Sequence, residues 1–372
     1  MTNLYYPLRS LQQGNWLKLI CGASFQHLPS VRNLTLIYAL AGVDCIDVSA
    51  DVAVIAAAQA ALKVAGSMKS VAQNRGYAIK ELPWLMVSLN ASEDPHFRKA
   101  AFDPTTCPPE CPRPCEQICP AQAIVFQRRG DNFSGVSEPN CYGCGRCLPI
   151  CPSQLIRTHA YFVQKEMLAP VVLSQGVDAV EIHTQVGQYP EFASLWNSIK
   201  PWVDRLKLVA ISCPDGEGLI DYLWSLYKLI SPLKSALIWQ TDGRPMSGDI
   251  GDGTTIAAVK LAQKVLAAKL PGYVQLAGGT NSYTVPKLQK LGMLGSNLVR
   301  DNTSSFISGV AYGSYARVLL SPVLERLEQL QINKTNETST FIGLEQEPQL
   351  LWEAVNIAHS LVCQLKPTPT TC

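Results

Sequence analysis

The chain has 372 residues, with 31 Lys and Arg against 29 Asp and Glu and a formal net charge of +2, so it is long enough for one large domain and a smaller one. Charged residues make up 16% and apolar residues 47%, and the absence of a basic run gives no reason to expect a nucleic-acid partner. No apolar run reaches the roughly 18–20 residues that cross a bilayer and no signal peptide is recognised, so we expect a soluble cytoplasmic protein with no transmembrane segment.

Eight short apolar runs alternate with amphipathic stretches along most of the chain. Runs that are apolar on both faces are typical of parallel strands buried beneath helices. The segments between them repeat apolar residues at helical spacing, as at 52–64 and 219–229. This α/β alternation predicts a (β/α)8 TIM-like barrel, with a doubly wound open sheet as the alternative. The expected strands are 17–21, 45–48, 85–89, 179–182, 206–211, 236–239, 273–276 and 306–310.

The order of these elements divides the chain into four parts. Residues 1–102 hold the first three strands and residues 160–330 hold the other five. Within these parts, residues 15–102 and 160–329 total 258 residues, close to the ~250 of such a barrel. Residues 103–159 form an insertion after the third strand, and residues 331–372 are expected to be a polar linker and a last helix. Because barrels carry their ligand sites at the carboxyl ends of the strands, the insertion should emerge on that same face.

The insertion contains two groups of four cysteines, and each group is followed by a proline. The second group begins at Cys141 and reads C-x2-C-x2-C-x3-C-P, the spacing that holds [4Fe–4S] clusters in bacterial-type ferredoxins. In proteins with two clusters, the fourth cysteine of each run binds the cluster of the other run. This rule predicts a ferredoxin-like domain with one cluster on Cys119, Cys141, Cys144 and Cys147, and another on Cys107, Cys111, Cys115 and Cys151.

The first group departs from the ferredoxin spacing. Its gaps are three, three and three residues, and only the ending from Cys115 to Pro120 is regular. Prolines such as Pro108 and Pro109 also remove amides that would otherwise bond cluster sulfurs. The alternatives for this site are therefore a strained [4Fe–4S] cluster or a [3Fe–4S] cluster with one cysteine unused. Two four-cysteine zinc sites are the competing interpretation, but zinc sites use two separated pairs, whereas each group here is a run of four. Disulfides among these eight cysteines are not expected in a reducing cytoplasm.

Glycines and polar residues follow the expected strands, above all the seventh and the eighth. Barrels often bind phosphate at this position, where bare amides and a helix N-terminus approach an anion. The alternative is that the glycines serve the turn conformation alone. His183, at the end of strand four, is a candidate acid or base, although a histidine there is more commonly structural. The residues expected to hold the phosphate of a flavin mononucleotide (FMN) or a similar ligand are Gly278, Gly279, Gly313, Ser314 and Arg317.

Several longer segments resemble one family over nearly the whole chain, with the likeness fading after about residue 330. They are WLKLICGASFQ (16–26), AGVDCIDVSAD (41–51), NCYGCGRCLPICP (140–152), SCPDGEG (212–218), WQTDGRPMSGDIGDG (239–253) and QLAGGTN (275–281). Together they resemble the light-dependent period (LdpA) family of cyanobacteria. The resemblance implies a redox-active iron–sulfur protein that feeds the light-linked redox state into the circadian clock. It also implies contact with clock input and core-clock proteins such as CikA and KaiA.

Two functions remain open from the sequence. In the first, the protein is a redox sensor whose clusters report electron supply and alter its binding to clock partners. In the second, it is an oxidoreductase that takes electrons from ferredoxin and passes them to a flavin or a phosphorylated substrate in the barrel mouth. A complete barrel with polar strand ends favours the second function, and the resemblance favours the first. Purely structural clusters are a third alternative.

Overall fold

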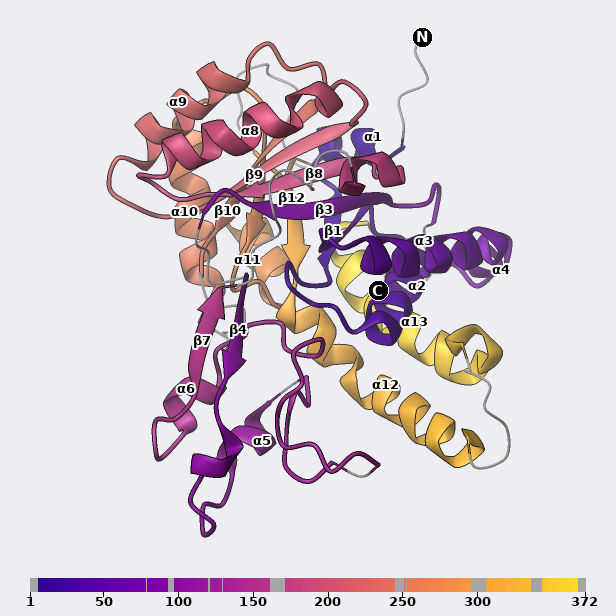
Figure 1. The fold of residues 1–372 in the computed structure, drawn as a ribbon. Helices are drawn as coiled ribbons and strands as arrows, with labels where there is room; N and C mark the ends of the chain where they lie inside the picture. Colours follow the sequence, from indigo (N-terminus) through magenta and orange to yellow (C-terminus); the bar gives the residue numbers. More distant parts are fainter. Residues whose placement is uncertain are drawn as a thin grey trace.

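The computed structural model describes residues 6–77, 79–92, 97–119, 121–128, 130–160, 171–244, 251, 253–295, 306–335 and 343–366. Eight parallel strands form a closed barrel, which confirms the predicted (β/α)8 fold (Figure 1). An open sheet is excluded because the first strand pairs with both the second and the last. The barrel strands are β1 (Trp16–Ile20), β2 (Cys45–Ser49), β3 (Trp84–Asn90), β8 (Ala179–His183), β9 (Leu208–Pro214), β10 (Ala236–Asp242), β11 (Tyr273–Ala277) and β12 (Ile307–Tyr312).

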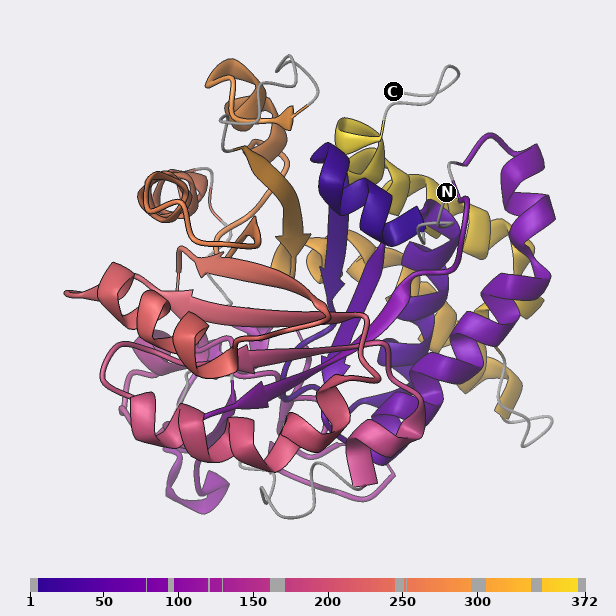
Figure 2. The ribbon, with the colours of Figure 1, turned by 90° about the horizontal axis from the view of Figure 1, so that it is seen from above.

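Helices surround the barrel and bury its outer face (Figure 2). One of them, α12, continues into the segment expected to begin the polar linker at residue 331, and α13 then packs back against α2 and α12. The helices of this outer layer are α1 (Tyr6–Gln13), α2 (Leu28–Ala41), α3 (Val52–Ser67), α4 (Lys69–Asn74), α8 (Tyr189–Val203), α9 (Leu219–Ile230), α10 (Thr255–Ala267), α11 (Thr284–Lys290), α12 (Ser314–Thr335) and α13 (Pro348–Leu365).

Local sequence signals set the ends of helices beside the first two strands. Helix α2 ends at Gly42, which has a φ of 98° and donates its amide to the Tyr38 carbonyl, as helix C-caps commonly do. Helix α3 begins after Asp51, whose carboxylate accepts from the amide of Ala53 at 2.8 Å and from that of Val54 at 3.2 Å. This side chain satisfies two of the amides that a helix start leaves open.

The inside of the barrel changes from apolar to charged along the strands. At the amino-terminal end, Leu11 of α1 closes the barrel over an apolar cluster that includes Trp16 and Trp84. Two residues further along β1, Lys18 points into the barrel and meets the carboxylate of Glu181 from β8. Because side chains alternate between the faces of a strand, the inward positions form successive layers. The middle layer here is polar, and it leads to the carboxyl face.

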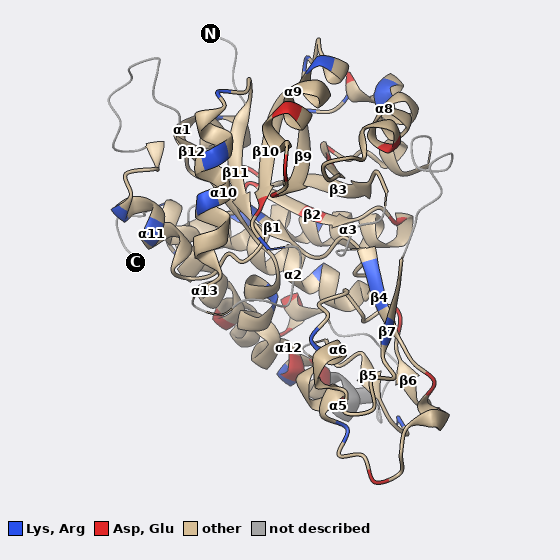
Figure 3. Ribbon diagram, turned by 90° about the vertical axis from the view of Figure 1, so that its left-hand side faces the viewer, with Lys and Arg blue, Asp and Glu red and all other residues tan. Residues whose placement is uncertain are grey.

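The insertion between β3 and β8 leaves the barrel at that carboxyl face (Figure 1). An antiparallel pair, β4 with β7, leads outward, and the β5–β6 pair lies beyond it. Figure 3 shows lysine, arginine, aspartate and glutamate scattered over the barrel and the insertion. Within the described ranges, no helix is both long and apolar enough to cross a membrane. The elements of the insertion are β4 (Arg98–Ala101), α5 (Pro114–Ile118), β5 (Ile124–Val125), β6 (Gly135–Val136), α6 (Cys147–Ile150) and β7 (Arg157–Ala160).

Candidate functional site

Four cysteines line one cavity on the side of the insertion that faces the barrel. They are Cys119, which follows α5, Cys141 and Cys144 from the loop before α6, and Cys147, the first residue of α6. Burial, together with the neighbouring thiols of Cys144, Cys141 and Cys119, raises the pKa of the Cys147 thiol to about 12. Four thiols that influence one another around a single space are the arrangement that a bound iron–sulfur cluster needs. Iron would deprotonate them outright.

Backbone amides already point at two of these sulfurs. The Ala123 amide donates to Cys119 Sγ at 3.2 Å, and the Ala100 amide donates to Cys141 Sγ at 3.4 Å. Such hydrogen bonds raise the reduction potential of an iron–sulfur cluster, because they stabilise the added negative charge. The rest of the cavity wall is mostly apolar, with Ile124 and Val136 among its residues. This group of four is called the proximal group below.

The other four cysteines gather further from the barrel and form the distal group. Burial, together with the hydrogen bond and charge of Cys111, raises the pKa of Cys107, and Cys151 adds to the effect. Cys151 and Cys107 also raise the pKa of Cys115, after burial and against the amide of Glu116. Of these four thiols only Cys115 is buried, so the distal group is the more accessible of the two.

The structure therefore brings the eight cysteines together in the two sets that the ferredoxin rule predicts. Each set combines three cysteines of one run with the last cysteine of the other, namely Cys119 in the proximal group and Cys151 in the distal group. Within the described part of the chain, no three Cys, His, Asp or Glu side chains converge closely enough to hold a single metal ion. Thiols that line a space rather than a point suit a multi-iron cluster better than a tetrahedral zinc ion.

Tyr142 forms the wall between the proximal group and the mouth of the barrel. It lies next to Cys141 in the chain. It lines the cavity of the proximal group and also a second cavity at the carboxyl ends of the barrel strands, which is called the mouth cavity below. Its ring carries the Arg317 guanidinium 4.1 Å from the ring centroid, and the Phe25 ring packs edge-on at 5.6 Å. Tyr142 was not predicted as a site residue, although its place inside the second cysteine run was a usable signal.

All five residues predicted to hold a phosphate line the mouth cavity: Gly278, Gly279, Gly313, Ser314 and Arg317. Gly278 has a φ of +62°, and a Cβ there would stand 1.8 Å from Asp242 Oδ1. The positive φ and the close approach of Asp242 therefore require a glycine at this position whether or not a phosphate binds there. Arg317 donates to the Ile20 and Cys21 carbonyls at 2.8 and 2.9 Å and to Ser314 Oγ at 2.8 Å. It thus ties the end of β1 to the start of α12 as well as lining the cavity.

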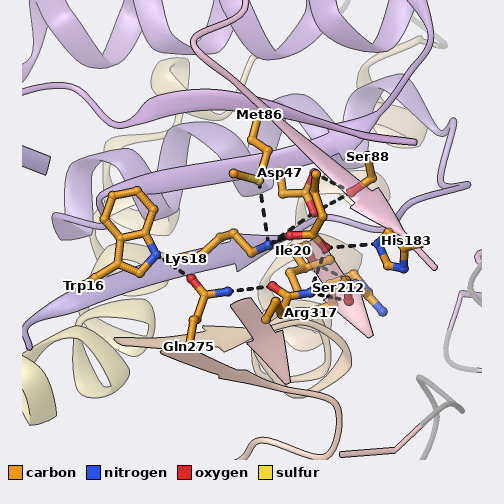
Figure 4. Close-up of polar contacts among 12 residues, drawn as sticks. Trp16, Lys18, Ile20, Asp47, Met86, Ser88, His183, Ser212, Gln275 and Arg317 are labelled. Carbon is orange, nitrogen blue, oxygen red and sulfur yellow. Dashed lines mark hydrogen bonds and ion pairs between the residues drawn. The ribbon is translucent and has the colours of Figure 1, made fainter. Parts of the chain in front are cut away.

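The floor of the mouth cavity is a chain of buried polar side chains, of which only His183 was predicted from the sequence as a candidate site residue (Figure 4). Glu181 is at its centre. Its carboxylate contacts the Lys18 ammonium, lies 3.0 Å from His183 Nε2, and accepts from Gln240 Nε2 at 2.7 Å. The chain continues from Gln240 to Gln275, whose Nε2 donates to Gln240 Oε1 at 2.6 Å, and Gln275 accepts from Trp16 Nε1 at 2.5 Å.

Asp47 completes this network on the side of β2. It accepts from Ser88 Oγ at 2.8 Å and lies 3.8 Å from Lys18 Nζ. Burial raises the pKa of Asp47 to about 7, against the opposing charge of Lys18 and with the like charge of Glu181. Burial also favours a higher pKa for Glu181, but the charge of Lys18 and the contact with His183 outweigh burial and hold the pKa of Glu181 below its usual value. Glu181 is therefore the ionised carboxylate of the pair.

A barrel with two four-thiol groups on its carboxyl face is, by fold and chemistry, an iron–sulfur protein of the (β/α)8 class. Comparison with known proteins gives the same answer. Residues 107–162 match the LdpA Fe-S cluster-binding domain, and residues 171–364 match the Light dependent period A C-terminal domain. Light dependent period A of Synechococcus elongatus is 49% identical over 361 residues, which cover 97% of this chain and 94% of that protein. The chain belongs to the light dependent period A family.

Proposed function

We propose that this protein is a redox sensor that adjusts the period of a cyanobacterial circadian clock to light-dependent electron supply. The observation that carries the proposal is the placement of the two thiol groups. The distal group lies toward solvent, where an electron donor such as ferredoxin has access, and the proximal group lies against the barrel through Tyr142. The name of the Synechococcus relative supports a role in period control.

Two iron–sulfur clusters carry the redox change in this proposal. The proximal group, Cys119 with three regularly spaced cysteines, holds a [4Fe–4S] cluster. The distal group holds a second cluster, either [4Fe–4S] or, because its spacing is irregular, [3Fe–4S]. When bound, each cluster supplies a reversible one-electron change. The protein supplies the thiolates and amide donors such as that of Ala123. We place it in the cytoplasm, where a reducing environment would keep the thiols available.

The partners in this proposal are the clock proteins CikA and KaiA, as the family resemblance implies. The test measures the affinity of the full-length protein for each of them under anaerobic conditions, once after dithionite reduction and once after ferricyanide oxidation. We expect the two states to differ in affinity by several-fold, and Cys144→Ser, which removes a proximal ligand, to lose the difference. Equal affinities in the two states, with both clusters intact, would contradict the proposal.

A second function, ferredoxin-linked oxidoreductase, is favoured by the polar cavity that adjoins the proximal group. Electrons would pass from the clusters, past Tyr142, to a flavin or phosphorylated molecule in the barrel mouth. The test is to denature anaerobically purified protein and to identify the small molecules that it releases. About one flavin or phosphorylated molecule per chain would support this function. Two clusters' worth of iron with no other bound molecule would contradict it.

A further inference from the structure

The wall of the mouth cavity carries groups of both charges. It includes Arg317 and the first residue of α12, a helix of 22 residues whose N-terminus favours anions. Arg317 is 7% exposed, and its Nη atoms donate to the end of β1 and to Ser314. Its buried Nε has no hydrogen-bond partner among the residues that the structure describes. Glu181, His183 and Asp242 line the same cavity, and Asp242 lies beside Gly278. Arg317 and the helix N-terminus therefore favour an anionic group, while the imidazole and the carboxylates suit a group that gives or takes a proton.

His183 has the surroundings of an acid–base residue. Its Nε2 lies 3.0 Å from Glu181 Oε1, and the ring of Phe97 packs edge-on against it, with the centroids 5.2 Å apart. The side chain is buried, yet it forms part of the cavity wall. An imidazole that a buried carboxylate orients toward a cavity is a recurring arrangement in general acid–base catalysis.

The charges that act on His183 come from four strands. Glu181 on β8 contacts it directly, while Lys18 on β1 and Asp47 on β2 lie behind that carboxylate. Asp242 on β10 lines the same cavity. Because Lys18 holds Glu181 in its ionised form, the carboxylate can accept a hydrogen bond from His183 Nε2 and orient the ring. The imidazole is thereby held in the wall of the cavity.

A purely structural role does not account for this layer of charges. The interior of a (β/α)8 barrel is commonly filled with bulky branched apolar residues. Buried ion pairs such as Lys18–Glu181 are often no more stabilising than apolar residues of similar volume. The charged layer lies directly beneath a cavity that opens to the carboxyl face, which is where such barrels bind their substrates.

We propose that the mouth cavity binds a small anionic molecule and that His183 exchanges a proton with it as an acid–base residue. This inference rests on the oxidoreductase function proposed above, and it narrows the class of molecule that the barrel mouth would bind. The cavity is about 60 Å³, against the roughly 300–1,000 Å³ of pockets for drug-sized ligands. It suits the phosphate or carboxylate end of a small molecule and not the enclosed ring system of a flavin.

Calorimetry of anion binding tests the proposal on full-length, cluster-loaded protein. The probes are sulfate, for a tetrahedral anion, and acetate, for a carboxylate, because neither titrates near pH 7.5. Each titration is repeated in buffers of different ionisation enthalpy, so that the number of protons taken up is measured. The variants are His183→Gln and Arg317→Gln, with His159→Gln on the exposed strand β7 as the matched control. Iron content and circular dichroism report whether each variant keeps its fold and clusters.

We expect at least one anion to bind the wild type with uptake of a fraction of a proton. His183→Gln should abolish the uptake while the affinity changes by less than about tenfold, and Arg317→Gln should weaken binding by more than tenfold. Binding of sulfate alone indicates a phosphate ligand, and binding of acetate alone a carboxylate. Failure of both anions to bind, or undiminished uptake in His183→Gln, would overturn the inference. Either result would leave the clusters and the oxidation-dependent binding of clock partners unaffected, because separate experiments test them.

Discussion

The buried ammonium of Lys18 should be one of the costliest charges in the barrel to remove. Lys18 and Glu181 are both 0% exposed, and Asp47 lies 3.8 Å from the same Nζ. Lys18→Met keeps the length of the side chain but leaves two buried carboxylates without their cation. Removing one partner of a buried pair costs about 3–5 kcal/mol. At an unfolding entropy of about 2.1 cal/mol/K per residue, this cost lowers the Tm of the 372-residue chain by about 4–6 °C.

Urea and thermal unfolding of a double-mutant cycle measure this effect. The variants are Lys18→Met, Glu181→Gln and the double substitution, all with their iron content checked. Because the double variant no longer contains an unpaired Glu181 charge, we expect it to be more stable than the sum of the single effects predicts, by 1 kcal/mol or more. A cost below about 1 kcal/mol for Lys18→Met, or strict additivity, would refute the account of the charged layer.

Three further predictions concern the clusters, the mouth and the pH dependence of stability. Cys144→Ser should lose about half of the iron, while circular dichroism shows that the barrel still folds. Cys45→Ala, which changes a cysteine inside the barrel, should keep all of its iron. Equal iron contents in the two variants would argue against the proximal site. Gly278→Ala should cost well over 1 kcal/mol in urea unfolding, because its Cβ would meet Asp242. Gly292 has a φ of +63° but no atom of the described residues within 4 Å of its Cβ position, so Gly292→Ala should cost only about 1 kcal/mol. Equal costs would contradict the close approach at Gly278. Because burial raises the pKa of Asp47 to about 7, its stabilising contribution is full below about pH 4 and is lost as the pH rises towards 7. In Asp47→Asn, the urea concentration at the unfolding midpoint should therefore change less with pH over this range. A pH dependence identical to that of the wild type would contradict the raised pKa of Asp47.

The barrel could be predicted because each of its strands contains a continuous apolar run in the sequence. The runs at 85–89 and 236–239 became β3 and β10 with ends extended by a few residues. At the carboxyl ends the extensions are polar: Asn90 ends β3, and Asp242 at the end of β10 lines the mouth cavity. The end of α12 was harder to place, since the polar residues that follow Leu330 satisfy a helix as well as a linker.

The charged layer was missed because each member is a single charge inside an apolar run. Lys18, Asp47 and Glu181 belong to three different strands, and only the register of the closed barrel brings them to one level. A period-two reading of each run would have put all three on the inward face. The spacing rule for ferredoxins, by contrast, acts within one short segment, and it anticipated both thiol groups.

The contact of Tyr142 with Arg317 illustrates the same limit. The two residues are far apart in the sequence and belong to different parts of the fold, so no local pattern joins them. In the structure the Arg317 guanidinium lies over the Tyr142 ring and also donates to the end of β1. The residue predicted to bind a phosphate therefore also connects the barrel mouth to the proximal group.

The most direct test of the central claim is the iron, acid-labile sulfide and zinc content of anaerobically purified full-length protein, measured with its electron paramagnetic resonance spectrum before and after reduction. Two clusters predict about eight iron atoms per chain, or about seven if the distal cluster is [3Fe–4S], with matching sulfide and a reversible change of the spectrum. Zinc in place of iron, or a spectrum that reduction and reoxidation leave unchanged, would contradict the account.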